Sequence, residues 1–433
     1  MIRSVRNNQS QLATVAFGVL VVCAVLDLNW VLGVATGITQ VVSGLYLLTV
    51  IILITQSRCI ALNSRVVVAL CASLIAYIWF GAFFSATFQG YVPENYVPQY
   101  LNGVLIILAV SSFVIAASPS DLQRSVRIFK YALLLSTVAT IATPLFGFYL
   151  QTQDRLDTLT GRSFGLFENP NDAGFAAVFA LVFVLICPAR NKLAQITETI
   201  LPLIACAASM SRAAIIALIG VALIYLVYKG RISMLAALGI GLGVAVTQGV
   251  PQLVTGAVVD PGQMNRLDEM IQFFSGQLNE NSTGHRFTLW AIGLERIERE
   301  FPLGGGLGTL HFMPGGVLVN GIWQGVHNSY LMILGESGLL PFLMFVFALL
   351  LWLRAALQRN TQWYQLACFF ALQCILMTAH NTLSIRFVNL VIGFMLGLLA
   401  RVSIRSQIMH TRSVAKRDPG TLLIRSLNRR GEK

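Results

Sequence analysis

The chain has 433 residues, of which 56% are hydrophobic and only 11% charged, and its mean hydropathy is +0.73. Soluble domains carry roughly a quarter charged residues, so this composition excludes a soluble protein and indicates a protein with several membrane spans. The apolar runs approach the roughly 20 residues that a helix needs to cross a bilayer, which excludes an outer-membrane barrel with alternating strands of about 10 residues. We therefore expect an all-α polytopic membrane protein.

Twelve apolar runs predict transmembrane helices, with boundaries good to about 2–4 residues. They lie near residues 11–26, 39–56, 66–84, 100–117, 127–150, 172–188, 195–209, 212–228, 231–248, 331–357, 363–380 and 385–403. The first run lacks a small-residue cleavage site, so it is expected to be retained as a helix. The resulting division is nine spans in 1–249, a large periplasmic loop with a surface helix in 250–327, three spans in 328–404 and a basic cytoplasmic tail in 405–433.

The distribution of basic residues predicts the orientation, because positively charged loops stay in the cytoplasm. With the N-terminus inside, 22 of the 30 Lys and Arg residues fall on the inner side, and the large loop faces outward. The net charge of +12 is then mainly a topology signal directed at anionic lipid headgroups, and nucleic-acid binding is not expected. The seven cysteines lie in spans or at inner ends, so neither a disulfide nor a Cys-based metal site is expected.

Two connections on the outer side carry arginines. The loop that ends at Asn171 contains Arg155 and Arg162, which fit either solvent-exposed charges or ligand contacts. Its last part, Asn169-Pro170-Asn171, is typical of a turn, after which Asn171 or Asp172 can cap the next helix. Arg212 lies at a tight turn between two spans, where an arginine either faces a cavity or partner, or extends its head to the interface.

The large loop contains one amphipathic pattern, from about Phe287 to Phe301. Its apolar stripe, which is typical of a helix that lies along a membrane surface, consists of Phe287, Trp290, Ala291, Leu294, Ile297 and Phe301. Arg286 begins this helix, where backbone N–H groups and the macrodipole favour an anion, although pairing with an acid such as Glu280 is the alternative. A glycine turn, Gly304-Gly305-Gly306-Leu307-Gly308, follows the helix.

His327 begins the segment His327-Asn328-Ser329-Tyr330, where the loop returns to the membrane. A lone histidine at a helix start is commonly a satisfied polar residue, but histidine is also the side chain best suited to proton transfer near neutral pH. We expect His327 on the same membrane face as Arg212 and Arg286. The weaker rivals for its role are His285, His311 and His380.

Arginines and a histidine at an outer membrane surface, beside apolar spans, fit an amphiphile with an anionic headgroup, such as a lipid diphosphate. Arginine stabilises charge that grows on a leaving phosphate, and histidine can accept a proton from an attacking hydroxyl. The outer loops contain no Asp-x-Asp pair and no His/Cys cluster at ligand spacing, so neither a metal nor another cofactor is expected. The sequence also lacks a Walker phosphate loop, which argues against ATP hydrolysis.

Several motifs follow one another in order along the second half of the chain. They are Ser211-Arg212-Ala213, Gly284-His285-Arg286 with Leu289-Trp290, the turn from Gly304 to Gly308, and His327-Asn328-Ser329-Tyr330 with Leu334-Gly335-Glu336-Ser337-Gly338. This order and spacing resemble the O-antigen ligase and O-antigen polymerase superfamily. By motif the resemblance covers about Asn169 to Gly338, and elsewhere it rests on the pattern of spans and one long periplasmic loop.

The resemblance implies a metal-independent glycosyltransferase of the GT-C type in the bacterial inner membrane, with both termini cytoplasmic. It would transfer a glycan from undecaprenyl diphosphate to a sugar hydroxyl of lipid A–core at the periplasmic face, with inversion at the anomeric carbon. His327 would then be the general base, and Arg212 and Arg286 would hold the diphosphate, with Arg155 and Arg162 as weaker candidates. The residues that would orient the histidine or the acceptor are Asn328, Tyr330 and Glu336.

Other functions remain as alternatives. We favour ligase over polymerase because such polymerases commonly carry two sizeable periplasmic loops, and here the second, from Gln151 to Asn171, is short. A related O-linked oligosaccharyltransferase is a further alternative. A lipid-linked glycan flippase would equally fit twelve spans and a cationic cavity, but matching halves are typical of transporters and are not found here. A membrane scaffold without chemistry leaves the outer arginines unexplained.

Overall fold

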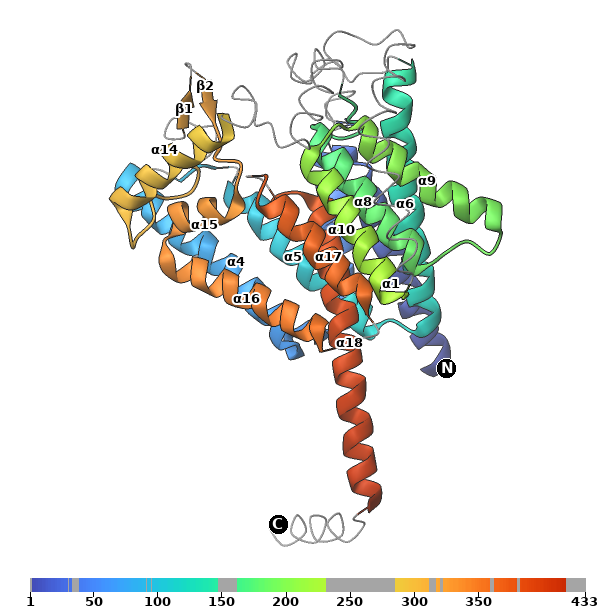
Figure 1. Ribbon diagram of the computed structural model, residues 1–433. Helices are drawn as coiled ribbons and strands as arrows, with labels where there is room; N and C mark the ends of the chain where they lie inside the picture. The colour runs from blue at the N-terminus through green and yellow to red at the C-terminus, as the bar shows by residue number, and fades with distance from the viewer. Residues whose placement is uncertain are drawn as a thin grey trace, which may run out of the picture.

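The computed structural model describes residues 2–29, 31–32, 39–90, 92–94, 96–146, 162–230, 285–310, 317–319, 322–358, 362–379 and 382–417. Over these residues the chain is helical apart from one short hairpin, which confirms the expected helical class (Figure 1). The α-helices are α1 (Ile2–Val25), α3 (Thr39–Ser57), α4 (Arg65–Phe84), α5 (Tyr96–Ala116), α6 (Pro119–Phe146), α8 (Pro170–Ile186), α9 (Lys192–Ala208), α10 (Arg212–Tyr228), α14 (His285–Glu300), α15 (Ser329–Ser337), α16 (Leu339–Leu357), α17 (Trp363–Leu376) and α18 (Arg386–Arg417). The hairpin consists of β1 (Val317–Val319) and β2 (Ile322–Gln324), paired antiparallel.

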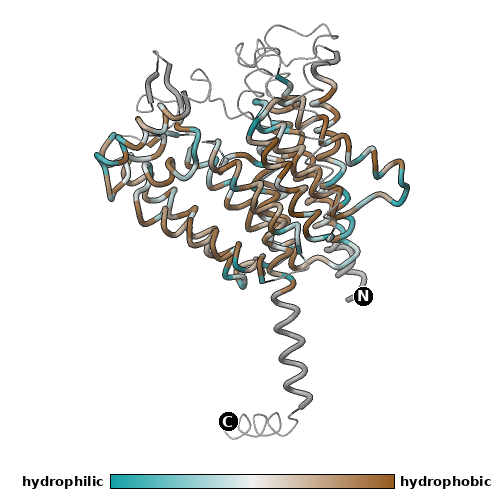
Figure 2. The backbone as a smooth tube through the Cα atoms, in the orientation of Figure 1, coloured by the Kyte–Doolittle hydropathy of each residue, from teal (hydrophilic) through white to brown (hydrophobic). Residues whose placement is uncertain are grey.

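Helix α8 is the centre of the main bundle. Every residue from Ala173 to Val184 is buried, because this stretch is apolar on all sides and has no face suited to water. Helices α6, α9, α10 and α17 pack against it. Figure 2 shows hydrophobic residues predominating along the helices, whereas hydrophilic ones gather mainly at helix ends.

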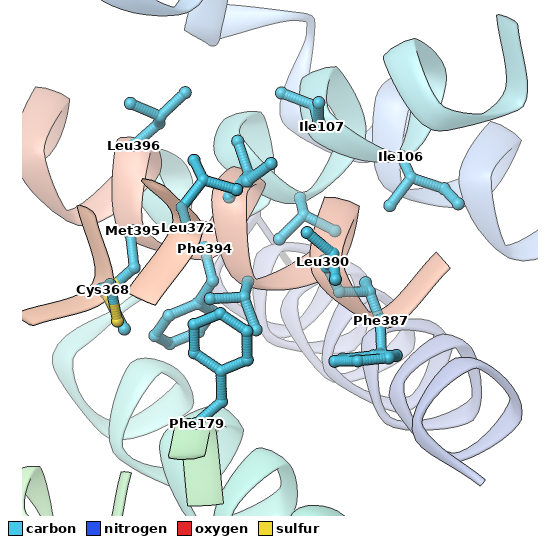
Figure 3. Close-up of a cluster of buried hydrophobic side chains, with 14 of the residues drawn as sticks. Ile106, Ile107, Phe179, Cys368, Leu372, Phe387, Leu390, Phe394, Met395 and Leu396 are labelled. Atoms are coloured by element: carbon cyan, nitrogen blue, oxygen red, sulfur yellow. The ribbon is translucent and has the colours of Figure 1, made fainter. Parts of the chain in front are cut away.

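Aromatic side chains fill the space between α8 and its neighbours. The ring of Phe183 lies 4.5 Å from that of Phe129 on α6 and 5.5 Å from that of Phe394 on α18, centre to centre. Figure 3 shows Phe394 and Phe387 of α18 in the same cluster as Phe179 of α8. Such rings contribute large buried areas, so this cluster fixes the position of α18 relative to α8.

Helix α18 packs closely on α5 and then leaves the bundle. A side chain at Gly397 would approach Val114 to 2.7 Å, so small residues allow this contact. Arg401 is buried and donates hydrogen bonds to the carbonyl oxygens of Val114 and Ala117 at 2.8 and 2.6 Å, which caps the end of α5. The helix continues to Arg417, beyond residue 405 where the tail was expected to begin, and its lower end lies on the same side of the bundle as the N-terminus (Figure 1).

A second group of helices lies beside the main bundle (Figure 1). Helix α4 packs on α15 and α16, and α14 packs on α15. The expected single span at 331–357 is wrong, because the chain breaks at Gly338 into α15 and α16. Gly338 has φ +85°, and a side chain there would meet the Pro302 carbonyl oxygen at 2.8 Å, so the turn after α14 occupies the space that a continuous helix would need.

The apolar helices agree with a multi-pass membrane protein. Four described helices are long and apolar enough to cross a membrane: Arg65–Gln89, Tyr96–Ala116, Pro119–Ala142 and Leu339–Leu357. Five shorter apolar helices are Gln11–Val25, Val41–Ser57, Pro170–Ile186, Arg212–Tyr228 and Trp363–Leu376. Every expected span except 231–248, which lies outside the described residues, coincides with a helix or, for 331–357, with a broken pair. The count of twelve spans stays a prediction.

Candidate active site

The upper end of the bundle, as drawn in Figure 1, is where α8 and α10 begin and α17 ends. Helix α8 starts with a side-chain cap. The Asn169 Oδ1 accepts hydrogen bonds from the backbone N–H groups of Asn171 and Asp172 at 2.9 and 3.1 Å, and Pro170 occupies the first helical position. A side-chain cap at this position was predicted, but the predicted capping residue, Asn171 or Asp172, is wrong, because Asn169 lies before Pro170 and caps the helix.

Asn171 joins three segments of the chain. Its Oδ1 accepts hydrogen bonds from Arg162 Nη2 at 3.0 Å and from Ser211 Oγ at 2.9 Å. Arg162 also donates its Nε–H to the carbonyl oxygen of Ser209 at 3.2 Å, and only 6% of the residue is exposed. The start of α8, the segment before it and the α9–α10 turn therefore form one unit. We call it the arginine corner, and its members are Arg162, Asn171, Ser209, Ser211 and Arg212.

Arg212 is the first residue of α10. Ser211 caps this helix, because its Oγ accepts the backbone N–H of Ala214 at 3.4 Å. A cation at a helix N-terminus faces the positive end of the macrodipole, which is unfavourable by about 0.3–1 kcal/mol at an exposed site. Because an anion reverses that sign and also meets the backbone N–H groups, this position favours anion binding. The guanidinium, amide and hydroxyl groups of the corner likewise suit an anion better than a metal ion.

The packing of α10 on α17 brings Arg212 level with the end of α17. The two helices run antiparallel, with the ring of Tyr225 4.9 Å from that of Trp363 and Gly220 directly against Phe370. Continuing this register places Arg212 beside Leu376, the last residue of α17. The turn after that residue is therefore the next part of the chain to meet the arginine corner.

The segment that follows His327 contacts this same turn. Two residues further on, the Ser329 Oγ donates a hydrogen bond to the carbonyl oxygen of Ala379 at 2.7 Å and lies 3.0 Å from the Thr382 hydroxyl. His327 itself has a left-handed backbone, with φ +49°. Helix α10, which begins at Arg212, and the segment that begins at His327 therefore both contact α17 or the turn that follows it.

The three residues expected to support His327 have defined contacts. Asn328 caps α15, since its Oδ1 accepts hydrogen bonds from the backbone N–H groups of Tyr330 and Leu331 at 3.0 and 3.2 Å. The Tyr330 hydroxyl donates to Gln373 Oε1 on α17. Glu336 is fully buried and accepts a hydrogen bond from the Tyr77 hydroxyl of α4 at 2.6 Å. These contacts join α15 to α17 and α4.

The glycine turn after α14 lies against the end of α15. Gly305 and Gly306 donate their backbone N–H groups to the carbonyl oxygens of Gly335 and Glu336, at 2.8 and 3.0 Å. Gly306 has φ +101°, and a side chain there would come within 2.5 Å of Ser85, the residue that follows α4. The turn needs glycine because it passes between two helices at backbone distance.

Helix α14 differs from the expected pattern of a single apolar stripe. Leu289 and Ile297 are buried in its contact with α15, whereas Phe287, Leu294 and Phe301 remain exposed, by 55%, 45% and 55%. The expected stripe grouped Ile297 with the three exposed residues, and the reason for the error is that α15 covers one side of the helix. The apolar surface is therefore divided between a protein contact and an exposed row at seven-residue spacing.

Glu300, the last residue of α14, packs against the glycine turn, where a side chain on Gly305 would clash with its carboxylate. This partial burial raises the pKa of Glu300 above its usual range, while Arg296, at 3.9 Å, and Arg299 lower it. Because the folded-state pKa is raised, the associated stability is present at low pH and lost as the pH rises through that pKa.

Some candidates cannot be placed by their side chains. Arg155, His311 and His380 lie outside the described residues. Arg286 and His285 form the start of α14, as expected, and the structure describes only their backbone. Within the described part of the chain, no group of three His, Cys, Asp or Glu residues could hold a metal ion.

Sequence reasoning missed three residues that shape the site. Asn171 was assigned to helix capping, but Asn169 fills that role and leaves Asn171 for the arginine corner. The repeated Asn on both sides of Pro170 was a usable signal, because one helix needs only one cap. Tyr77 and Gln373 lie inside apolar runs, and nothing in those runs pointed to their partners.

Comparison with known proteins adds one family. Residues 199–346 match the family model described as O-antigen ligase. The match includes Arg212, Arg286, His327 and Glu336, and it begins after Arg155 and Arg162. A search of curated proteins gives no match.

Proposed function

Because residues 199–346 match the O-antigen ligase family model, we propose that this chain belongs to that superfamily and acts as the ligase. Membership implies a multi-pass membrane enzyme of the glycosyltransferase type. The proposed reaction moves a glycan from undecaprenyl diphosphate to a sugar hydroxyl of lipid A–core, in lipopolysaccharide biosynthesis. It takes place at the periplasmic face of the inner membrane, with both termini in the cytoplasm.

The observation that supports this proposal is that two segments meet at α17: α10, whose first residue is Arg212, packs against this helix, and Ser329, two residues after His327, donates a hydrogen bond to the Ala379 carbonyl oxygen in the turn after it. The arginine comes from the arginine corner, through the first residue of α10, and the histidine precedes the cap of α15. An anion-binding group and a proton acceptor in segments that contact one helix are what a lipid diphosphate donor and a hydroxyl acceptor require.

The proposed chemistry is a single displacement. The acceptor hydroxyl oxygen attacks the anomeric carbon, its proton passes to His327, and the bond between that carbon and the phosphate oxygen breaks. Undecaprenyl diphosphate leaves with the electron pair of that bond, so the anomeric configuration inverts. The diphosphate is already a good leaving group, and the reaction needs neither a general acid nor a metal.

Arg212 and Arg286 hold the diphosphate in this proposal. Each lies in the first turn of a helix, α10 and α14, so guanidinium and helix N-terminus act together on the anion. Arg162 is engaged by Asn171 and Ser209, and its proposed part is to keep the corner in place. Arg155 stays a candidate ligand for the same anion.

The test is a reconstitution with purified protein, an undecaprenyl diphosphate-linked glycan and purified lipid A–core, with EDTA and without nucleotide. We expect glycan ladders on lipid A–core. His327→Ala should lower turnover by about 10²–10⁴-fold, the usual contribution of a general base, and should leave the protein folded. His410→Ala, in the lower part of α18, is the matched control and should keep full turnover. Full turnover in folded His327→Ala would refute the assignment.

The same assay separates the alternatives. Elongation of the glycan on its own undecaprenyl carrier would identify the polymerase, and transfer to an added protein would identify an O-linked oligosaccharyltransferase. If a verified donor gives no product with either acceptor, the flippase becomes the hypothesis to test, by following the donor across the bilayer of sealed vesicles.

A further inference from the structure

The buried carboxylate of Glu336 links α4 to the large loop. The residue is 0% exposed, and its Oε2 accepts the Tyr77 hydroxyl at 2.6 Å. Its Oε1 accepts the backbone N–H of Leu310 at 3.3 Å. A buried polar group that loses a hydrogen-bond partner is costly. Glu336 therefore fixes Leu310 relative to the membrane helix α4.

Leu310 in turn restrains Val326, the residue before His327. The carbonyl oxygen of Leu310 accepts the backbone N–H of Val326 at 3.1 Å. Val326 is fully buried, and its side chain sits over Gly293 of α14, where an added Cβ would lie 3.0 Å from Val326 Cγ2. Val326 can thus move little in either direction, and its neighbour His327 takes up the left-handed backbone.

We propose that Tyr77 and Glu336 are positioning residues, which set the location of His327 through Leu310 and Val326. The proposal rests on the role proposed above for His327 as the general base. Neither side chain needs to touch a substrate, because the effect travels through three hydrogen bonds. A misplacement of about 1 Å at a reacting group can cost about 100-fold in rate, so a small loosening of Val326 would be measurable.

The geometry allows this link to be cut without removing the loop. The glycine turn is held separately by backbone hydrogen bonds from Gly305 and Gly306 to the end of α15, which side-chain substitutions leave in place. Tyr77→Phe also keeps the ring that packs against Tyr100 at 5.3 Å. Tyr77→Phe removes the hydroxyl contacts with Glu336 and Tyr100, whereas Glu336→Ala removes the acceptor of the Leu310 N–H.

The variant Glu336→Gln distinguishes a positioning role of Glu336 from a role of its charge. Its amide oxygen can accept the Leu310 N–H while its NH₂ group donates to the Tyr77 oxygen, so the link is preserved without the charge. Alanine removes both contacts. Positioning predicts that Glu336→Gln stays within about threefold of the parent kcat, whereas Glu336→Ala and Tyr77→Phe lower kcat about tenfold or more with KM unchanged.

Two readouts test the proposal on the full-length protein in detergent or nanodiscs. Amide hydrogen exchange should speed up at Leu310 and Val326 in Glu336→Ala, and kcat and KM are measured in the ligase assay. Ser111→Ala is the matched control, because it removes another buried hydroxyl, which donates to the Gly393 carbonyl oxygen at 3.0 Å, far along the chain from the loop. It should leave both the loop exchange and kcat unchanged.

Faster exchange in Glu336→Ala with unchanged kcat would overturn the proposal. An equal loss of kcat in Glu336→Gln and Glu336→Ala would also overturn it, because it would indicate a role of the charge. So would a loss of kcat that is fully explained by a smaller fraction of folded protein. If Glu336→Ala does not fold, Tyr77→Phe decides by the same criteria. Failure of the proposed function shows separately, as full activity in His327→Ala, and the exchange result still reports whether the link exists.

Discussion

A buried ion pair joins α6 to α9, the helix that leads to the arginine corner. Lys130 of α6 contacts both carboxylate oxygens of Glu198 on α9 at 2.9 Å and also donates to the Cys187 carbonyl oxygen at 3.2 Å. The side chains are only 2% and 12% exposed. Breaking such a pair strands a charge in a dry site, so we expect Lys130→Met to lower the free energy of unfolding by about 3–5 kcal/mol.

Replacing both charges gives the opposite expectation. With Lys130→Met and Glu198→Leu together, no ion is stranded, and apolar pairs of similar volume are commonly neutral or more stable by about 1–4 kcal/mol. The lost hydrogen bond to Cys187 opposes this by about 1 kcal/mol. We therefore expect the double variant to lie between about 1 kcal/mol less stable and about 3 kcal/mol more stable than the parent, with a large coupling energy between the two sites.

The assay is unfolding of the detergent-solubilised protein by SDS titration, followed by tryptophan fluorescence, for the parent, both single variants and the double variant. Turnover in the ligase assay is measured on the same samples. The double variant should recover turnover along with stability, because α9 then keeps its place. If it is as unstable as Lys130→Met, the loss comes from packing and the reasoning from stranded charge is refuted.

Three further predictions address the corner, the bundle and the surface helix. Arg212→Lys should lower turnover nearly as much as Arg212→Ala, because an ammonium cannot grip a phosphate at two points; full activity with Lys would contradict this geometry. Gly220→Ala should cost about 1–3 kcal/mol by forcing α10 from α17, whereas Gly44→Ala, with nothing within 4 Å, should be neutral or stabilising in the same unfolding assay. A spin label at Leu294→Cys should be accessible to lipid-soluble oxygen and one at Arg299→Cys to a water-soluble quencher; equal water accessibility would show that α14 does not rest on lipid.

The helices could be predicted from the sequence because their signal is local. Apolar runs of sufficient length were enough to place them. The run from 331 to 357 was misread because Gly338 is a break only in the presence of the turn at Pro302, which lies far away in the chain. The stripe of α14 was misread for a similar reason, since periodicity shows that a face is apolar and not which part of it another helix covers.

The candidate site, too, could be predicted only in part. The residue types and their order pointed to Arg212 and His327, and the structure adds α17 as a helix contacted both by α10 and by the segment after His327. The pair of Tyr77 and Glu336 is separated by 259 residues and could not be found by spacing or pattern. Buried polar residues inside apolar runs were the remaining signal, because such groups need partners.

The backbone of His327 explains why so many contacts meet there. A residue other than glycine at φ +49° costs roughly 1–3 kcal/mol and persists only where its surroundings determine it. Here Val326 is held by Leu310 before it, and Ser329 is held by the turn after α17 behind it. A general base must present its ring at a fixed distance from the acceptor, so the strain is consistent with the proposed role. Because the restraints originate on α4, α14 and α17, the membrane helices define the site as much as the loop does.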